Sequence, residues 1–235
     1  MAHRRLLIAA TIAALFALPA PAAAAVHVQL RVEGPRGTLF QGSVVPVRGT
    51  LRDTKGVRHR TSRRTALGAL VRASRLRHWP LRLKWFDLGT GGWSGFFVAG
   101  IDRIVPDGTR HTWGFKIGHA AASKGAGSIR ARRGMRILFY YTRLTPSFHT
   151  EPTLGLTLRP RHPRTRALVT FRVTAYDDHG VAAPAAGAWV WIDGTGVRAD
   201  ASGRVQVRLR HGRHRVRATR FRSIRSPRLW VRAGR

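Results

Sequence analysis

Cysteine and asparagine are absent from this chain of 235 residues, and acidic residues are scarce. The lack of cysteine excludes disulfide bonds, thiolate metal sites, a cysteine nucleophile and a lipid anchor on cysteine. Ten acidic residues stand against 43 lysines and arginines, which gives a formal net charge of +33. Such a charge favours anionic partners and affects solubility, and it says little about fold.

Arginine supplies almost all of this charge, because the chain has only four lysines. Its density peaks at the carboxyl end, where twelve arginines lie between Arg204 and Arg235. A GC-rich coding bias would explain arginine in place of lysine, and these positions would then form an ordinary solvent face. The bias does not explain the shortage of Asp and Glu, so we favour a role of the charge in binding and keep the solvent face as the alternative.

The amino terminus has the organisation of an export signal. His3, Arg4 and Arg5 form a positive segment, residues 6–18 are apolar, and alanines 22–25 offer a cleavage site. The apolar stretch is shorter than the roughly 20 residues that span a membrane. We therefore expect a signal peptide at residues 1–25, with the general secretory route favoured over twin-arginine export. The mature chain is predicted to be secreted without a transmembrane anchor, free or held non-covalently at the cell envelope.

Two domains are predicted for the mature chain. Residues 144–152 carry two prolines and small polar residues between two well-patterned regions, and proline removes a backbone donor from any continuing ladder. We place a first domain at residues 26–147, a linker at 148–153 and a second domain at 154–235.

The first domain is predicted to be a small α+β domain, with one short helix on a β-sheet. Apolar residues alternate over residues 26–32, which indicates a strand with one buried face. Leu67, Leu70 and Val71 recur at helical spacing in residues 65–74, with Thr65 or Ser62 as the cap. Further strands are expected at residues 81–88, 95–104, 111–117 and 136–141.

The order of several short segments in this domain resembles the DUF4430 family, which is similar to the small β-rich domain at the carboxyl end of transcobalamin and intrinsic factor. The segments are Thr65-Ala-Leu67, Trp113-Gly-Phe115-Lys-Ile117-Gly, Gly125-Ala-Gly127 and Arg133-Gly134-Met-Arg-Ile137-Leu-Phe139-Tyr140-Tyr141. The chain departs from the family pattern at Ile117-Gly118-His119 and at Gly134-Met135. It also lacks the helical barrel of cobalamin carriers, so the resemblance implies a fold and not cobalamin binding.

The second domain is predicted to be an Ig-like β-sandwich. Residues 167–176 alternate, and short strands are expected at 154–158, 189–192, 205–209, 215–219 and 229–231. Residues 184–192, the turn Ala199-Asp200-Ala201-Ser-Gly203 and residues 205–218 resemble bacterial Ig-like and carboxypeptidase-regulatory-like repeats. The whole chain is therefore expected to be mainly β.

The pleat of the last strands predicts a polyanion-binding face. If Val205, Val207 and Leu209 face the core, alternation turns the intervening arginines outward. A hairpin at residues 211–212 would then set four arginines side by side: Arg208, Arg210, Arg215 and Arg217. The guanidinium fork suits phosphate, so we expect contact with an anionic envelope polymer or a surface protein. An ordinary solvent face is the other interpretation.

Nucleic acid is a further partner, but the chain has no motif that reads bases, so only non-specific binding is expected. Trp189, Trp191 and Trp230 lie on predicted strands where alternation cannot bury all three. We leave open whether each belongs to the core or stacks on a base or a sugar.

A rival hypothesis places a small ligand in the first domain, in a pocket lined by Trp85, Trp93 and Trp113. No catalytic residue, metal site or cofactor is predicted. Ser94 lacks the surroundings of a nucleophile elbow, and His211 and His214 lie across a turn without an acidic partner. Asp177 and Asp178 suit a turn better than a calcium site. We therefore expect a binding protein rather than an enzyme. Its oligomeric state is not indicated.

Overall fold

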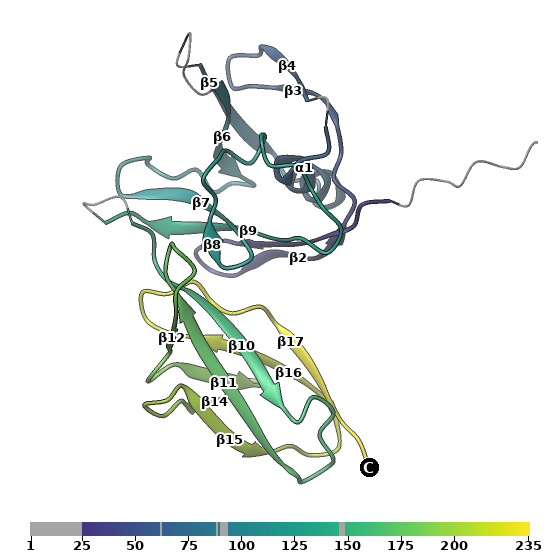
Figure 1. The fold of residues 1–235 in the computed structure, drawn as a ribbon, viewed down its shortest axis with the longest axis vertical. Helices are drawn as coiled ribbons and strands as arrows, with labels where there is room; N and C mark the ends of the chain where they lie inside the picture. Colours follow the sequence, from purple (N-terminus) through teal and green to yellow (C-terminus); the bar gives the residue numbers. More distant parts are fainter. Residues whose placement is uncertain (1–24, 62, 88, 90–93, 146–148) are drawn as a thin grey trace, which may run out of the picture.

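The computed structural model describes residues 25–235 except 62, 88, 90–93 and 146–148. The predicted signal peptide, up to residue 24, and the predicted domain boundary near residue 148 lie outside the described residues. Strands make up 52% of the described residues and helix 6%, with one helix, so the expected mainly-β fold with one short helix is confirmed. The elements form two groups stacked along the long axis of the molecule (Figure 1).

The first group is built on a five-stranded sheet in the order β2-β1-β9-β7-β8. Its strands are β1 (Val28–Glu33), β2 (Thr38–Val44), β7 (His111–Ile117), β8 (Ala120–Ala121) and β9 (Arg136–Arg143). The pair β1–β9 is parallel and the other pairs are antiparallel. Two separate hairpins complete the group: β3 (Gly49–Arg52) with β4 (Arg58–Thr61), and β5 (Leu81–Asp87) with β6 (Ser94–Ile101).

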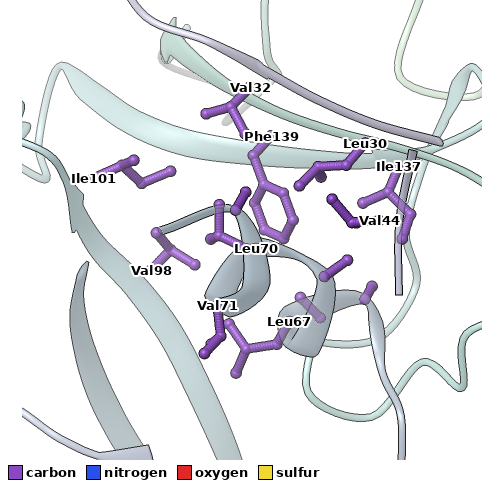
Figure 2. Packing of buried hydrophobic residues seen from close by; sticks show 14 of the residues in the cluster. Leu30, Val32, Val44, Leu67, Leu70, Val71, Val98, Ile101, Ile137 and Phe139 are labelled. Atoms are coloured by element: carbon purple, nitrogen blue, oxygen red, sulfur yellow. The ribbon is translucent and has the colours of Figure 1, made fainter. Parts of the chain in front are cut away.

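The helix α1 (Ala66–Arg77) packs against the sheet and fills the first core (Figure 2). Thr65 caps it as predicted, because the Thr65 hydroxyl accepts a hydrogen bond from the Gly68 amide at 3.2 Å. The helix ends at His78, whose positive φ of 56° is typical of a helix terminus. Leu67 and Leu70 are fully buried beside Phe139, and each such side chain contributes about 1.5–3 kcal/mol.

The second group is a two-sheet β-sandwich whose strand pairs are all antiparallel. One sheet holds β10 (Thr153–Arg159), β11 (Leu168–Tyr176), β12 (Ala182–Pro184) and β15 (Arg204–Arg208). The other has the order β14 (Thr195–Arg198), β13 (Trp189–Ile192), β16 (Gly212–Thr219) and β17 (Leu229–Ala233). Phe171, Val190 and Val216 are fully buried between the sheets, in a core separate from that around α1.

The predicted hairpin at residues 211–212 is wrong. Strand β15 pairs with β11, whereas β16 pairs with β13 and β17 in the opposite sheet. The chain therefore crosses from one sheet to the other after β15. Leu209 lies in this connection and is buried in the core, and its carbonyl accepts the Arg166 amide instead of a group on β16. A buried leucine at this point favours the crossing, because a tight hairpin would leave its side chain at the edge.

Glu33 of β1 joins the two groups through Arg217 and Arg225, and it also binds Arg31 of its own strand. Its carboxylate lies 2.9 Å from Arg217, 3.3 Å from Arg225 and 3.9 Å from Arg31. Thr38 also donates its hydroxyl to Glu33 at 3.0 Å. The Glu33 side chain is only 1% exposed, so one buried carboxylate holds three cations at this junction.

Lys116 makes a second polar contact between the groups. Its ammonium group is fully buried, donates to the Asp177 carbonyl at 2.6 Å and lies 3.3 Å from the Asp178 carboxylate. Asp178 in turn accepts the Thr150 amide at 2.8 Å. A small apolar cluster of Leu138, Tyr140 and Ile224 also spans the two groups. These contacts hold the groups in one arrangement.

A candidate anion-binding face of tryptophan and arginine

The acidic residues of this protein mainly accept hydrogen bonds from backbone amides. All ten lie within the described residues, and five of them accept backbone amides from residues two to four positions further along the chain. These are Asp53, Asp87, Asp107, Asp177 and Asp200. Hydrogen bonds from the amides of His111, Arg110 and Thr109 lower the pKa of Asp107 to about 2, although partial desolvation opposes them. The carboxylates therefore stabilise turns and leave most arginines without a partner.

The ion pairs show the same imbalance. Within the described part of the chain, only Arg31, Arg217 and Arg225 pair with a carboxylate, and all three pair with Glu33. The remaining ion pairs are made by Lys116 and by histidines. The protein thus does not neutralise its own arginine charge, which has to be balanced by counterions or by an anionic partner.

The outer surface of the sheet β14-β13-β16-β17 gathers arginine and tryptophan. We call it the Trp/Arg face, and its residues are Trp189, Trp191, Arg198, Arg213, Arg215, Arg217, Trp230 and Arg232. It arises from strict alternation: Val190, Val216 and Val231 point into the core, so their neighbours point outward. The three tryptophans are 44%, 40% and 54% exposed, which settles that none of them is a core residue.

Cross-strand register places tryptophan beside arginine. Trp189 is opposite Arg198, and Trp230 is opposite Arg215. The Arg213 guanidinium lies 4.1 Å from the centre of the Trp230 ring, within the range of a cation–π contact. Apolar and cationic groups are therefore mixed across one open surface.

Two of the indoles are held in place by neighbouring residues. The rings of Trp189 and Trp191 lie 6.0 Å apart at 31°, and the Trp191 ring nitrogen donates to the Thr219 hydroxyl at 2.8 Å. Gly196 lies beneath both rings, and a Cβ at this position would be 3.0 Å from Trp191 and 3.1 Å from Trp189. The glycine therefore provides the space in which the two indoles lie on the sheet.

Only part of the predicted arginine set meets on this face. Arg215 and Arg217 are on β16, but Arg217 is half-buried and bound to Glu33. Arg208 lies on the other sheet, where its guanidinium donates to the Arg166 carbonyl at 2.8 Å. Arg210 lies in the connection between the sheets. The hairpin that was expected to bring all four together does not exist.

The prediction missed three arginines of the face: Arg198, Arg213 and Arg232. The alternation that places Arg213 and Arg232 was visible in the sequence, since each strand reads as arginine or tryptophan between small or apolar residues. What the alternation could not show is that β13 lies between β14 and β16 and so joins Arg198 to the set.

His214 has an acidic partner, contrary to the sequence prediction. Its ring nitrogens lie 2.7 Å from the Asp193 carboxylate and 2.8 Å from the Arg210 carbonyl. Burial lowers the pKa of His214, but these hydrogen bonds and the Asp193 charge outweigh it, so the pKa is raised above its usual value. Asp193 also accepts the Arg215 amide at 2.7 Å. This pair thus fixes the β13–β14 turn against β16, beside the Trp/Arg face.

The tryptophans predicted to share a pocket in the first domain are divided. Trp85 stacks on His59, with ring centres 4.0 Å apart, and lines a cavity of about 270 Å³. Trp113 is buried and lines a different cavity of about 380 Å³. Trp93 lies outside the described residues. Trp85 and Trp113 therefore do not form one binding site.

The described residues contain neither a cluster of metal ligands nor a helix that could span a membrane. In residues 25–235, leaving aside the gaps, no three His, Asp or Glu side chains are grouped as metal ligands. None of the helices described has the length and apolar composition to cross a membrane. No protein-family model matches the chain, and no characterised protein or solved structure does so either.

Proposed function

We propose that this protein is an exported, non-catalytic binding protein that holds anionic polymers of the cell envelope on its Trp/Arg face. One observation carries the proposal: three exposed tryptophans lie among arginines, and only Arg217 of these arginines has a carboxylate partner within the described residues. Export is supported by the residues at positions 1–25, which have the pattern of a signal peptide.

The chemistry of the face suits a polymer that carries both phosphate groups and sugar or alkyl units. The guanidinium fork donates two parallel hydrogen bonds to a phosphate. An indole offers a flat apolar surface to the units between the phosphates. Nucleic acid shares this chemistry, but the face is an open sheet without an element that enters a groove, so such binding would be non-specific.

The test is retention of residues 26–235 on purified cell-wall sacculi, with and without their anionic polymers, over a salt series. Binding should need the polymers and weaken linearly in log salt, because bound counterions are released on association. The triple variant Arg213→Gln/Arg215→Gln/Arg232→Gln should reduce the salt slope by about three, one unit for each phosphate that an arginine no longer neutralises.

A matched variant separates the face from net charge. Arg110, Arg132 and Arg133 are exposed arginines of the first group, and changing all three to Gln removes the same charge. This control should retain wild-type binding, whereas Trp189→Ala/Trp191→Ala should weaken it without a change in charge. If both arginine triples lose the same affinity, binding follows total charge and the proposed face is refuted. Equal retention on sacculi stripped of polymer would indicate that the remaining peptidoglycan is the partner and would also refute the proposal.

A further inference from the structure

A cleft of about 610 Å³ lies between the two groups of strands. The first group contributes residues of β1, β2 and β9 and the turn at Gly118 and His119. The second contributes residues of β10 and the segment 227–230, which leads into β17. Its volume falls in the range of about 300–1,000 Å³ that is typical of small-molecule sites, which often form at domain boundaries.

The charged residues in the lining of this cleft are all cationic. The lining includes four arginines, Arg31, Arg77, Arg136 and Arg228, together with His119, and it includes no acidic residue. Arg31 shares Glu33 with two other arginines. Arg136 and Arg228 form no ion pair with any acidic residue, all of which are described. The cleft thus holds positive charge that the protein leaves unbalanced.

His119 is itself a lining residue, and the nearby positive charges affect its pKa. Its ring stacks on Tyr176 with centres 3.7 Å apart. Burial lowers the pKa of His119, and the charges of Arg136, Arg31 and Lys116 lower it further. The imidazole is therefore neutral near pH 7, where it is free to donate or accept a hydrogen bond.

Thr153 adds a polar group that has no partner. It lines the cleft and is 1% exposed, and its hydroxyl is the one buried side-chain polar atom in the described residues that forms no hydrogen bond. An unpaired buried hydroxyl is costly, and most such groups in folded proteins are satisfied. A ligand in the cleft would supply the missing partner.

Apolar side chains complete the lining, among them Leu39, Phe40 and Leu229. We propose that the interdomain cleft binds an organic phosphate, with its phosphate held by Arg136 and Arg228 and its apolar body against Leu39, Phe40 and Leu229. The lining has several arginines and no carboxylate of its own. Such a set suits a phosphate, which carries two negative charges and three acceptor oxygens, better than it suits a ligand with a carboxylate head. This site is distinct from the Trp/Arg face, with which it shares Trp230, and it does not depend on the polymer-binding proposal.

The probe is 1-naphthyl phosphate, titrated into residues 26–235 at pH 8 by isothermal calorimetry. Inorganic phosphate tests the head alone, 1-naphthol the body alone, and 1-naphthoate a singly charged head. We expect 1-naphthyl phosphate to bind at least about tenfold more tightly than each of these, since head and body act together and charged hydrogen bonds contribute strongly. Binding should also raise the pKa of His119, measured by NMR against His119→Gln.

Two variants locate the site. Arg136→Gln should weaken 1-naphthyl phosphate by about tenfold, as expected for the loss of a charged hydrogen bond. Thr153→Val should weaken it severalfold and leave the melting temperature equal or higher, because it removes a hydroxyl that lacks a partner in the free protein. Arg198→Gln and Trp189→Ala, on the Trp/Arg face and outside the lining of the cleft, serve as controls and should leave the affinity unchanged.

The proposal is overturned if 1-naphthyl phosphate binds no better than 1-naphthol or 1-naphthoate, or if Arg136→Gln and Arg198→Gln have equal effects. A soluble metabolite and a lipid headgroup both present this phosphate chemistry. Vesicles of phosphatidylcholine with phosphatidic acid distinguish them: retention that is lost in Arg136→Gln indicates the lipid, and no retention indicates the soluble compound.

Discussion

Glu33 offers the sharpest test of how the two groups of strands are joined. Replacing Glu33 with Gln keeps the shape of the side chain and removes its charge, so Arg31, Arg217 and Arg225 would face one another unneutralised. Burial lowers the pKa of Arg31 to about 10 even though Glu33 opposes this, and Arg217 and Arg225 lower it further. Removing one partner of a buried ion pair typically costs about 3–5 kcal/mol.

We therefore expect Glu33→Gln to lower the free energy of unfolding by about 3–5 kcal/mol, a large part of the about 5–15 kcal/mol typical of folded proteins. Urea unfolding followed by tryptophan fluorescence and circular dichroism measures the change. Because the loss falls on the junction, the two groups should then unfold in separate transitions. The double variant Glu33→Gln/Arg217→Gln should recover about 1–3 kcal/mol, since one uncompensated cation is removed.

The chain's other glutamate, Glu151, is the matched control, because it forms no ion pair and is half-exposed. Glu151→Gln should leave the unfolding free energy within about 0.5 kcal/mol of wild type. A Glu33→Gln protein that unfolds within about 1 kcal/mol of wild type, in a single transition, would refute the view that this carboxylate holds the groups together.

Three further predictions concern pH and packing. Burial raises the pKa of Asp178, but hydrogen bonds from Thr150 and the charge of Lys116 outweigh it and lower the pKa overall. The stability that Asp178 contributes is therefore complete above the unfolded pKa near 3.8 and is lost as pH falls through the lower folded pKa. Melting curves of Asp178→Asn should lack this loss of stability in acid, and an acid profile equal to that of wild type would contradict the prediction. The raised pKa of His214 gives stability that is present below the usual histidine pKa of 6.5 and is lost as pH rises through the folded pKa. In urea titrations, the unfolding free energy of His214→Gln should therefore change less with pH over that range. A pH profile parallel to that of wild type would contradict the pairing of His214 with Asp193. Gly68→Ala should destabilise the protein by about 1–3 kcal/mol or more, because the new Cβ would overlap the Val47 carbonyl. The control Gly127→Ala, whose Cβ would meet Leu67 at 3.7 Å, should be nearly neutral. Equal melting temperatures of the two variants would disprove the close contact between the helix and Val47.

Local patterns in the sequence predicted much of the fold. The Thr65 cap, the helix that follows it and the alternation of β11 and β16 each depend on neighbours within a few residues, and the structure has all of them. The same alternation, applied to Trp189, Trp191 and Trp230, showed that not all three could be buried but not which would lie outside the core. The answer required the partner strands, since the rings of Trp189 and Trp191 rest over Gly196 of β14.

The errors come from pairing between distant segments. A glycine between two strands at residues 205–219 is typical of a hairpin, yet the burial of Leu209 sends the chain to the opposite sheet. The pairing of Glu33 with Arg217 joins residues 184 positions apart. No local pattern carries such a contact, because it forms only when the two groups of strands pack against each other.

The use of aspartates to cap turns has a consequence for any preparation of this protein. Their negative charge is committed to backbone amides, so the arginines have to be balanced by whatever anions the buffer supplies. Chloride, sulfate and phosphate differ in how they bind guanidinium groups, and each would form a different salt of the same polypeptide. Solubility, mobility in an electric field and melting temperature are therefore joint properties of the chain and its counterions, and comparisons between laboratories require the anion to be matched.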